Sequence, residues 1–153
     1  MNSKIDFLKL VFPQMLHALD PEAKGAWGKM NAQQMVEHLT ESLYIANGKL
    51  YQNTELTPEQ TEKVRSFFLR DKPFRENTTN HLLPDVPPPA RNASMVDSIA
   101  EFDKELDLFF VEFEGDATRQ TLNPFAGPFG FKEWVHLLHK HFVHHAKQFG
   151  LME

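Results

Sequence analysis

Histidine is concentrated near one end of this sequence, where the stretch HLLHKHFVHH, residues 136–145, holds five of the chain's eight histidines. Neutral imidazole is a common ligand of transition metals, so the first chemistry that the cluster suggests is metal binding. The sequence contains no cysteine, which excludes disulfides, thiolate metal sites and cysteine nucleophiles together. Any metal must therefore be held by His, Asp or Glu.

The residues around this cluster have the period of an amphipathic helix, which we expect from about residue 131 to residue 149, with Gly150 as its C-terminal cap. With about 100° of rotation per residue, His141 and His145 fall on the same face as Trp134 and should point toward the core. Histidines at positions i and i+4 can reach one cation, as in the HExxH motif, whose glutamate this sequence lacks. The same phase places Lys140 on the solvent side of this helix. It places the other three histidines of the cluster on the solvent side or at the boundary: His136, His139 and His144.

Two ligands do not make a site, so a third is expected from another helix. The segment that begins at Asn31, a plausible N-cap, should be helical until about Gly48. His38 lies on the inward face of this expected helix and is the best third ligand. His17, off the apolar stripe of the first helix, and His81, in an irregular segment, are weaker candidates.

A simpler interpretation of these histidines stays open. A core-facing histidine is more often a hydrogen-bonded core residue than a ligand, and an i, i+4 pair arises easily by chance in a chain with eight histidines. Three buried imidazoles without a metal would each need polar partners, however, and the surrounding Phe, Leu and Met side chains offer few. This scarcity favours the metal site.

Three neutral imidazoles on a divalent cation would leave a net charge near +2 and at least one coordination position for water or substrate. Zinc and nickel suit nitrogen ligands, with iron, cobalt and copper as alternatives. A bound water with a lowered pKa would support hydrolysis, and a bound thiolate would support thiol transfer. The ligand set alone predicts either reaction.

Three further residues are candidates for supporting roles. Glu41, one turn beyond His38, is the carboxylate best placed to act as a catalytic base or as a partner of an imidazole N–H, although a solvated helix-face glutamate is the simpler interpretation. Gln148 is expected to hold the substrate or a histidine. Trp134, like Trp27, is expected to line the pocket or to belong to the core.

The rest of the sequence supplies the helices that must position these ligands. Helical period is also found at about residues 3–19, 58–70 and 94–114, and no segment alternates in the manner of a strand. Pro13 should kink or end the first of these helices. The last of them has the cleanest bundle seam, formed by Ile99, Phe102, Leu106, Phe109 and Phe113.

This pattern predicts an all-α fold, a four-helix bundle that spans residues 1–153 as one domain. Residues 58–70 would form a short extra helix in the long connection between the second and third bundle helices. Residues 72–91 should continue that connection as an extended, proline-rich spacer, although such a segment can also bind a partner domain. The loop at residues 123–130 should turn tightly into the last helix.

Composition and charge narrow the class of protein. The chain has 153 residues, of which 41% are hydrophobic and 24% charged, as is ordinary for a globular domain. A net charge of -5 argues against a nucleic-acid groove, and no run is long and apolar enough for a membrane span. The N-terminal segment does not resemble a signal peptide, so we expect a cytoplasmic location and give no weight to the sequons at Asn77 and Asn92.

Two segments taken together resemble the DinB/YfiT-like superfamily: GAWGKMNAQQMVEHLTESL, residues 25–43, and NPFAGPFGFKEWVHLLHKHFVHHAKQFGL, residues 123–151. Within it, the chain is similar to a branch catalogued as a domain of unknown function. The resemblance implies a bundle whose second and third helices run parallel. It also implies a three-histidine metal site, matched here by His38, His141 and His145.

The resemblance bears on function as well. Gln148 falls where members of the family often carry Gln or His. Some members of the superfamily are transferases that use low-molecular-weight thiols, and others have no known reaction. We therefore expect a metal-binding protein, with zinc or nickel most readily bound, that acts on a small molecule as a hydrolase or thiol transferase. The alternative is a non-catalytic bundle that binds a partner or a second copy of the chain.

Overall fold

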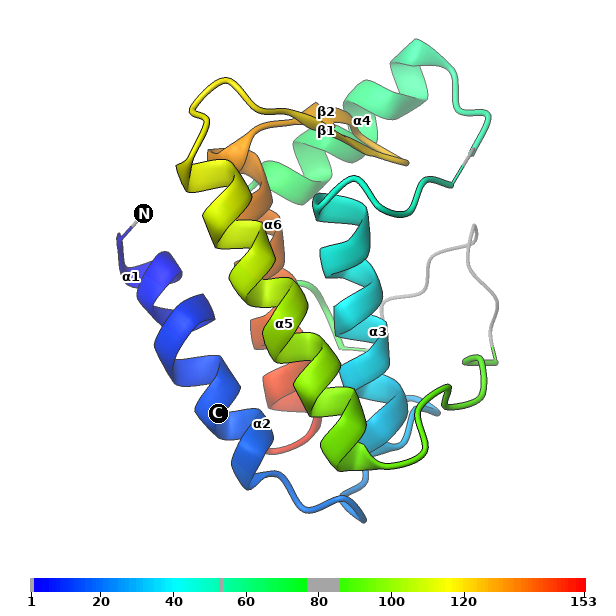
Figure 1. The fold of residues 1–153 in the computed structure, drawn as a ribbon. Helices are drawn as coiled ribbons and strands as arrows, with labels where there is room; N and C mark the ends of the chain where they lie inside the picture. Colours follow the sequence, from blue (N-terminus) through cyan, green and yellow to red (C-terminus); the bar gives the residue numbers. More distant parts are fainter. Residues whose placement is uncertain (1, 53, 77–85) are drawn as a thin grey trace.

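The chain folds into a bundle of long helices with a small hairpin at one end, as a computed structural model describes for residues 2–52, 54–76 and 86–153 (Figure 1). Asn77, His81 and the middle of the proline-rich segment lie outside the described residues. The elements, in chain order, are α1 (Asn2–Asp6), η1 (Phe7–Val11), α2 (Phe12–Ala18), α3 (Ala32–Ala46), α4 (Pro58–Leu69), α5 (Met95–Glu114), β1 (Thr121–Asn123), β2 (Gly127–Phe129) and α6 (Phe131–Gln148). All five expected helices are present, with boundaries close to those predicted.

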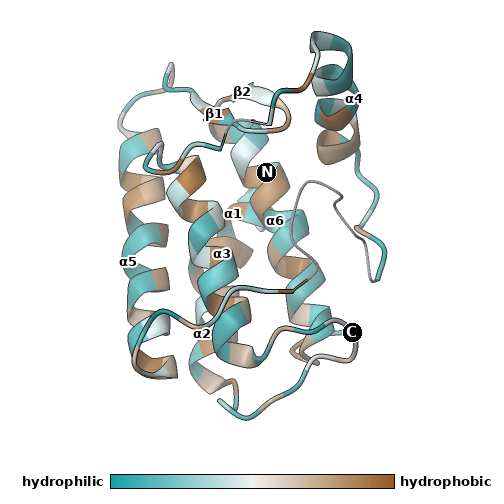
Figure 2. Cartoon of the chain, turned by 90° about the vertical axis from the view of Figure 1, so that its right-hand side faces the viewer, coloured by the Kyte–Doolittle hydropathy of each residue, from teal (hydrophilic) through white to brown (hydrophobic). Residues whose placement is uncertain are grey.

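Four helical rods make the bundle: the continuous N-terminal rod α1–η1–α2, then α3, α5 and α6. α3 and α5 run in the same direction side by side, while the N-terminal rod and α6 run in the opposite direction (Figure 1). α3 lies between α5 and α6 and contacts both (Figure 2). The long connection that carries α4 allows α3 and α5 to be parallel, because a short loop would force two successive helices to be antiparallel.

Local sequence signals explain where these helices begin. The Asn31 side chain accepts a hydrogen bond from the Gln34 N–H, and the Gln34 side chain accepts one from the Asn31 N–H, which confirms the N-cap of α3. Thr57 and Gln60 form the same reciprocal pair at the start of α4, where Pro58 occupies the first turn. These caps satisfy amide groups that have no partner inside the helix.

The predicted seam of α5 is buried along its whole length: Ile99, Phe102, Leu106, Phe109 and Phe113. Phenylalanines from three helices meet at the centre, where the Phe12, Phe102 and Phe142 ring centroids are 4.9 to 5.8 Å apart. Such tilted and edge-on ring pairs stabilise the fold beyond the apolar area that they bury. The core therefore fixes the N-terminal rod, α5 and α6 against one another.

Pro13 neither ends the first helix nor leaves it a regular α-helix. The turn before it is π-helical, and the Phe12 N–H donates to the carbonyl oxygen of Phe7, five residues earlier. In a regular α-helix the proline ring would collide with the carbonyl four residues before it. A wider π-turn is a known way to admit such a residue, and the helix continues to Ala18 with Phe12 and Leu16 buried.

The two short strands correct the expectation of a chain without strands. β1 and β2 pair antiparallel, with Thr121 opposite Phe129 and Asn123 opposite Gly127. β2 lies within the segment expected to be only a tight turn, residues 123–130, and β1 begins two residues before it. Each strand has three residues, and β2 contains Pro128, so neither shows the alternation or composition by which strands are recognised. The Asn123 side chain accepts hydrogen bonds from two backbone N–H groups inside the turn and thereby stabilises the shape of the turn.

The position of Lys140 differs from a second expectation, because helical phase placed this residue on the solvent side of α6. It is buried because α4 packs over that side of the helix. Its ammonium group donates to the carbonyl oxygens of Phe67, Phe68 and Arg70 at 3.0 to 3.3 Å, at the C-terminal end of α4. A cation at this end of a helix satisfies orphan carbonyls and complements the helix dipole, so Lys140 anchors α4 to the bundle.

A buried carboxylate, Glu37, connects α3 to the residues that precede α5. It is only 6% exposed, and its oxygens accept the backbone N–H groups of Arg91 and Asn92 and the hydroxyl of Ser98. Burial by itself raises the pKa of Glu37, but these hydrogen bonds, together with one from Gln33, outweigh burial and lower the pKa to about 2. The carboxylate is therefore ionised in the folded protein.

We expect the substitution Glu37→Gln to lower the free energy of unfolding by about 2–3 kcal/mol at pH 7, because the network is built around a charged acceptor. The pKa of Glu37 is lower in the fold than its ordinary value of 4.5, so its contribution is complete above about pH 4.5 and is lost as the pH falls toward 2. Urea unfolding of both proteins should show a stability difference that shrinks between pH 5 and pH 3. A difference that stays constant would mean that charge is not its source.

Candidate metal centre

Three histidines converge between α3 and α6. His38 comes from the middle of α3, and His141 and His145 come from successive turns of α6. One nitrogen of each ring lies within 4.8 Å of the others, and the ring centroids are 4.8 to 5.0 Å apart. The structure thus brings together the three residues that helical phase and family resemblance had selected.

The spacing of the rings fits a single transition-metal ion. Nε2 of His38 and Nε2 of His141 are 2.9 Å apart. Metal–nitrogen bonds of about 2.0–2.1 Å in a tetrahedral site place the ligand nitrogens about 3.3 Å from one another. The separations in the cluster, from 2.9 Å to at most 4.8 Å, bracket this value, so modest ring rotations suffice to reach a common centre.

Gln148 sets the proton position of His145. The Gln148 Nε2 donates to the carbonyl oxygen of Trp27 at 2.8 Å, because a carbonyl can only accept. Oε1 of the same amide therefore faces Nδ1 of His145, 2.6 Å away, and must accept a hydrogen bond from it. The proton of His145 is thus assigned to Nδ1, and Nε2 keeps a lone pair for a metal.

Ser42 sets the proton position of His141. Its hydroxyl donates to the carbonyl oxygen of His38 at 3.3 Å and lies 3.2 Å from Nδ1 of His141. A hydroxyl has one proton, so the hydrogen bond to the ring must come from the Nδ1–H of His141. Nothing in the sequence signalled the role of Ser42 as a histidine partner.

The electrostatics of the cluster favour neutral rings. Burial lowers the pKa of His38 to about 4 and that of His145 to about 3, with a further contribution from neighbouring histidines. Burial also holds the pKa of His141 well below its ordinary value. All three imidazoles are therefore neutral at pH 7, which is the form that binds a metal.

The other two residues expected near the site have no described contact with the three histidines. Trp134 is buried beside the hairpin, where its Nε1–H donates to the Thr121 hydroxyl at 2.7 Å and its ring packs on Phe129 at 5.1 Å. Its described contacts attach the hairpin to α6 and do not include the three histidines. Glu41 is partly exposed and accepts a long hydrogen bond, 3.5 Å, from Gln52.

The remaining described histidines lie outside the cluster. His144 is partly exposed between the rings of Trp27 and Phe74, at 5.5 and 6.1 Å. His136 and His139 are partly buried against the N-terminal rod, as expected for boundary positions. His17 is exposed and pairs with Asp103.

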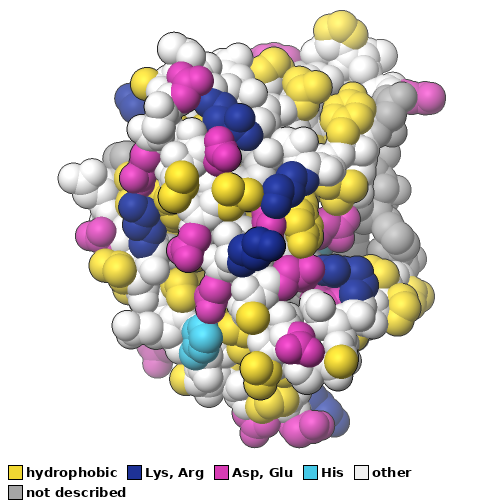
Figure 3. All heavy atoms as spheres, in the orientation of Figure 1, with side chains coloured by type: hydrophobic (Ala, Val, Ile, Leu, Met, Phe, Trp, Pro, Cys, Tyr) yellow, Lys and Arg dark blue, Asp and Glu magenta, His cyan; other side chains and the backbone are white. Residues whose placement is uncertain are grey.

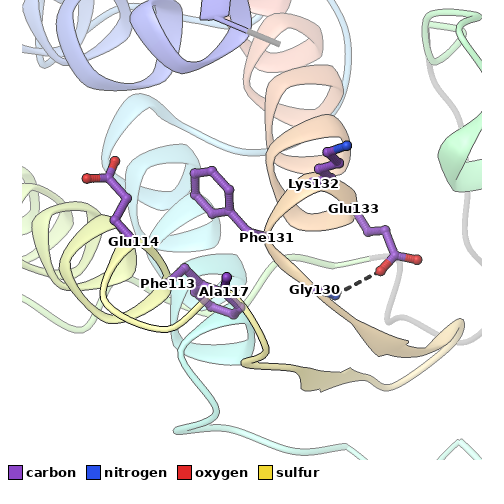
Figure 4. Close-up of a pocket in the computed structure, with 7 residues that line it drawn as sticks. All are labelled: Phe113, Glu114, Ala117, Gly130, Phe131, Lys132 and Glu133. Atoms are coloured by element: carbon purple, nitrogen blue, oxygen red, sulfur yellow. Dashed lines mark hydrogen bonds between the residues drawn. The ribbon is translucent and has the colours of Figure 1, made fainter.

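One depression on the described surface lies away from the histidines. It lies where α5 ends and α6 begins, as Figure 4 shows, and it is lined by Phe113, Glu114, Ala117, Gly130, Phe131, Lys132 and Glu133. His141 lies ten positions after Phe131 on α6, which is about 15 Å along the helix axis. A small molecule in this depression would therefore not reach the histidine cluster.

The surface on the side of the N-terminal rod and α5 carries lysines and arginines interspersed with aspartates and glutamates (Figure 3). In the part of the chain that the structure describes, no helix combines the length and apolar character needed to cross a membrane. The absence of a nucleic-acid partner and the cytoplasmic location remain predictions.

The chain matches no protein-family model, no curated protein and no solved structure in comparisons with each. Membership of the DinB/YfiT-like superfamily therefore stays a prediction. The geometry of the three histidines is the basis for inferring function.

The role of Ser42 can be tested by removing its hydroxyl. We expect Ser42→Ala to weaken metal binding about tenfold, because His141 loses the acceptor that orients its ring. Thr40→Val is the matched control, since the Thr40 hydroxyl donates to the Val36 carbonyl on the same helix and no described contact joins it to a histidine. Competition titration with a zinc chelator dye measures both affinities. An equal effect of the two substitutions would remove Ser42 from the site.

Proposed function

We propose that the protein binds one divalent transition-metal ion through His38, His141 and His145, and that zinc or nickel is bound most readily. The observation that carries this proposal is the orientation of the rings. His141 and His145 each direct Nδ1–H to a fixed acceptor, Ser42 and Gln148, which leaves their Nε2 lone pairs for a cation. Borderline nitrogen ligands of this kind suit zinc and nickel.

A three-histidine set leaves room for chemistry, because three protein ligands do not fill a four-coordinate ion. When bound, the metal would supply Lewis-acid activation of a water or a thiolate. We propose that the protein is a hydrolase or a low-molecular-weight-thiol transferase with a small-molecule substrate. The resemblance to the DinB/YfiT-like superfamily supports this class, and the neutral ligand set favours an anionic substrate group.

Glu41 is the proposed proton acceptor of this reaction. It lies one turn beyond His38 on α3, and it is partly exposed, so it can exchange protons with solvent or substrate. Its hydrogen bond to Gln52 is long and weak, which leaves the carboxylate able to reorient.

The alternative function is that of a non-catalytic bundle that pairs with a second copy of the chain. Leu10, Val11 and Val111 are exposed by 60%, 43% and 69%. The ion pair of Lys9 with Glu114, at 2.8 Å, joins η1, which carries Leu10 and Val11, to the end of α5, which carries Val111. Light scattering that reports a dimer in the wild type and a monomer after Leu10→Glu would support this alternative.

Elemental analysis tests the metal site directly. We expect about one equivalent of a transition metal in the purified, untagged protein and almost none in the folded double variant His141→Ala/His145→Ala. The double variant His136→Ala/His139→Ala is the matched control, because it removes two histidines from the same helix outside the cluster, and it should keep the metal. If the wild type contains no metal and takes up neither zinc nor nickel, the proposed function is wrong.

The substitution Glu41→Gln distinguishes the proposed enzyme from the non-catalytic bundle. We expect unchanged metal content and thermal stability but a loss of activity of about 100-fold or more, because the carboxylate acts as base and not as ligand. Rates with activated esters and with thiol acceptors, measured beside the wild type, give the comparison. Activity equal to that of the wild type would remove Glu41 from the mechanism.

A further inference from the structure

The loop that precedes α3 holds Gln148 from two sides. Its sequence is GAWG, residues 25–28, and we call it the GAWG loop. The Ala26 N–H donates to the backbone carbonyl of Gln148 at 2.7 Å, and the Trp27 carbonyl accepts from the Gln148 side chain at 2.8 Å. Gln148 is 3% exposed, so its amide has little access to water as an alternative partner. The loop thereby fixes both the backbone and the side chain of this residue.

Glycine is required at both ends of the GAWG loop. Gly28 has φ of +79°, and a Cβ built on it would lie 2.8 Å from Nε2 of Gln148. At Gly25 a Cβ would lie 2.8 Å from the Trp27 carbonyl oxygen and 3.1 Å from Cγ of Gln148. Real Cβ atoms do not tolerate contacts as short as 2.8 Å, so any larger residue would push the loop away from Gln148 or displace its amide.

The orientation of the Gln148 amide depends on this contact. A free glutamine amide can turn by 180° and exchange its oxygen and nitrogen. The Trp27 carbonyl oxygen can only accept a hydrogen bond. It therefore selects the orientation in which Nε2 of Gln148 faces the loop and Oε1 faces His145. The reversed amide would present N–H to His145 and would favour a proton on Nε2, the nitrogen that a metal needs.

We propose that the GAWG loop positions the metal ligand His145, acting through Gln148. This inference rests on the proposed function, because His145 needs positioning as a ligand only if the cluster binds a metal. Gly25, Gly28 and the Trp27 carbonyl are then positioning groups: none touches His145, but together they determine which of its nitrogens carries the proton. A segment that precedes α3 thus controls a ligand on α6.

The test compares Gly28→Ala with Gly127→Ala. Gly127 also has a left-handed backbone, φ +85°, but a Cβ there would meet only Cγ2 of Thr61 at 3.7 Å. Both variants should lose similar stability from backbone strain. Only Gly28→Ala is expected to weaken cobalt(II) binding, by about 10-fold to 100-fold, with a change in the visible spectrum of the bound cobalt.

A second readout does not depend on metal. Nitrogen-15 NMR of the histidine side chains, recorded before any metal is added, should show His145 with its proton on Nδ1 in the wild type and in Gly127→Ala. In Gly28→Ala the same ring should show a mixture of the two neutral forms. This measurement decides the positioning role even if the wild type binds no cobalt, an outcome that would overturn the proposed function alone.

A second variant covers the case in which Gly28→Ala does not fold. Gly25→Ala adds no left-handed strain, and Gly130→Ala is its control, because a Cβ at Gly130 would meet its nearest neighbour at 3.6 Å. A larger loss of cobalt affinity in Gly25→Ala than in Gly130→Ala supports the proposal. Equal cobalt affinities within each pair, with His145 unchanged in the NMR spectrum, would overturn it.

Discussion

The packing of three imidazoles between α3 and α6, with His145 buried and His38 and His141 partly buried, is the constraint that the surrounding structure has to meet. A buried polar nitrogen without a partner costs about 1–3 kcal/mol, and each ring has two nitrogens. The outward nitrogens of His141 and His145 are satisfied by Ser42 and Gln148. Their inward lone pairs then face the third ring, His38, which has a single proton to share. This excess of acceptors over donors is what a cation would balance.

The elements around the cluster can be understood as supports for it. α3 and α5 pack as a parallel pair, and Glu37 links α3 to the segment before α5 through several hydrogen bonds. On the other side, Lys140 attaches α4 to α6 one residue before His141. Trp134 attaches the hairpin two turns before His141. The backbone that carries the three histidines is thus held at points on both sides of the cluster.

Much of the fold was predictable because its signals are local. The periods of five helices, the Asn31 and Thr57 caps and the seam of α5 each depend on residues close together in the sequence. The hairpin was not predicted, since strands of three residues that include Pro128 have no detectable period. The burial of Lys140 was missed for a different reason. A single helix shows which side faces away from its own apolar stripe, but not whether another helix covers that side.

The candidate site was likewise predictable only where its signals are local. His141 and His145 could be paired by phase within one helix, and His38 could be chosen by its inward position on another. The partners of these rings could not be found this way, because Ser42 and Trp27 meet α6 only after the chain has folded. Their hydrogen bonds involve one hydroxyl and one backbone carbonyl, groups that occur throughout any sequence. Spacing can therefore select the candidate ligands, whereas the orientation of their rings depends on contacts between segments more than a hundred residues apart, such as Trp27 and Gln148.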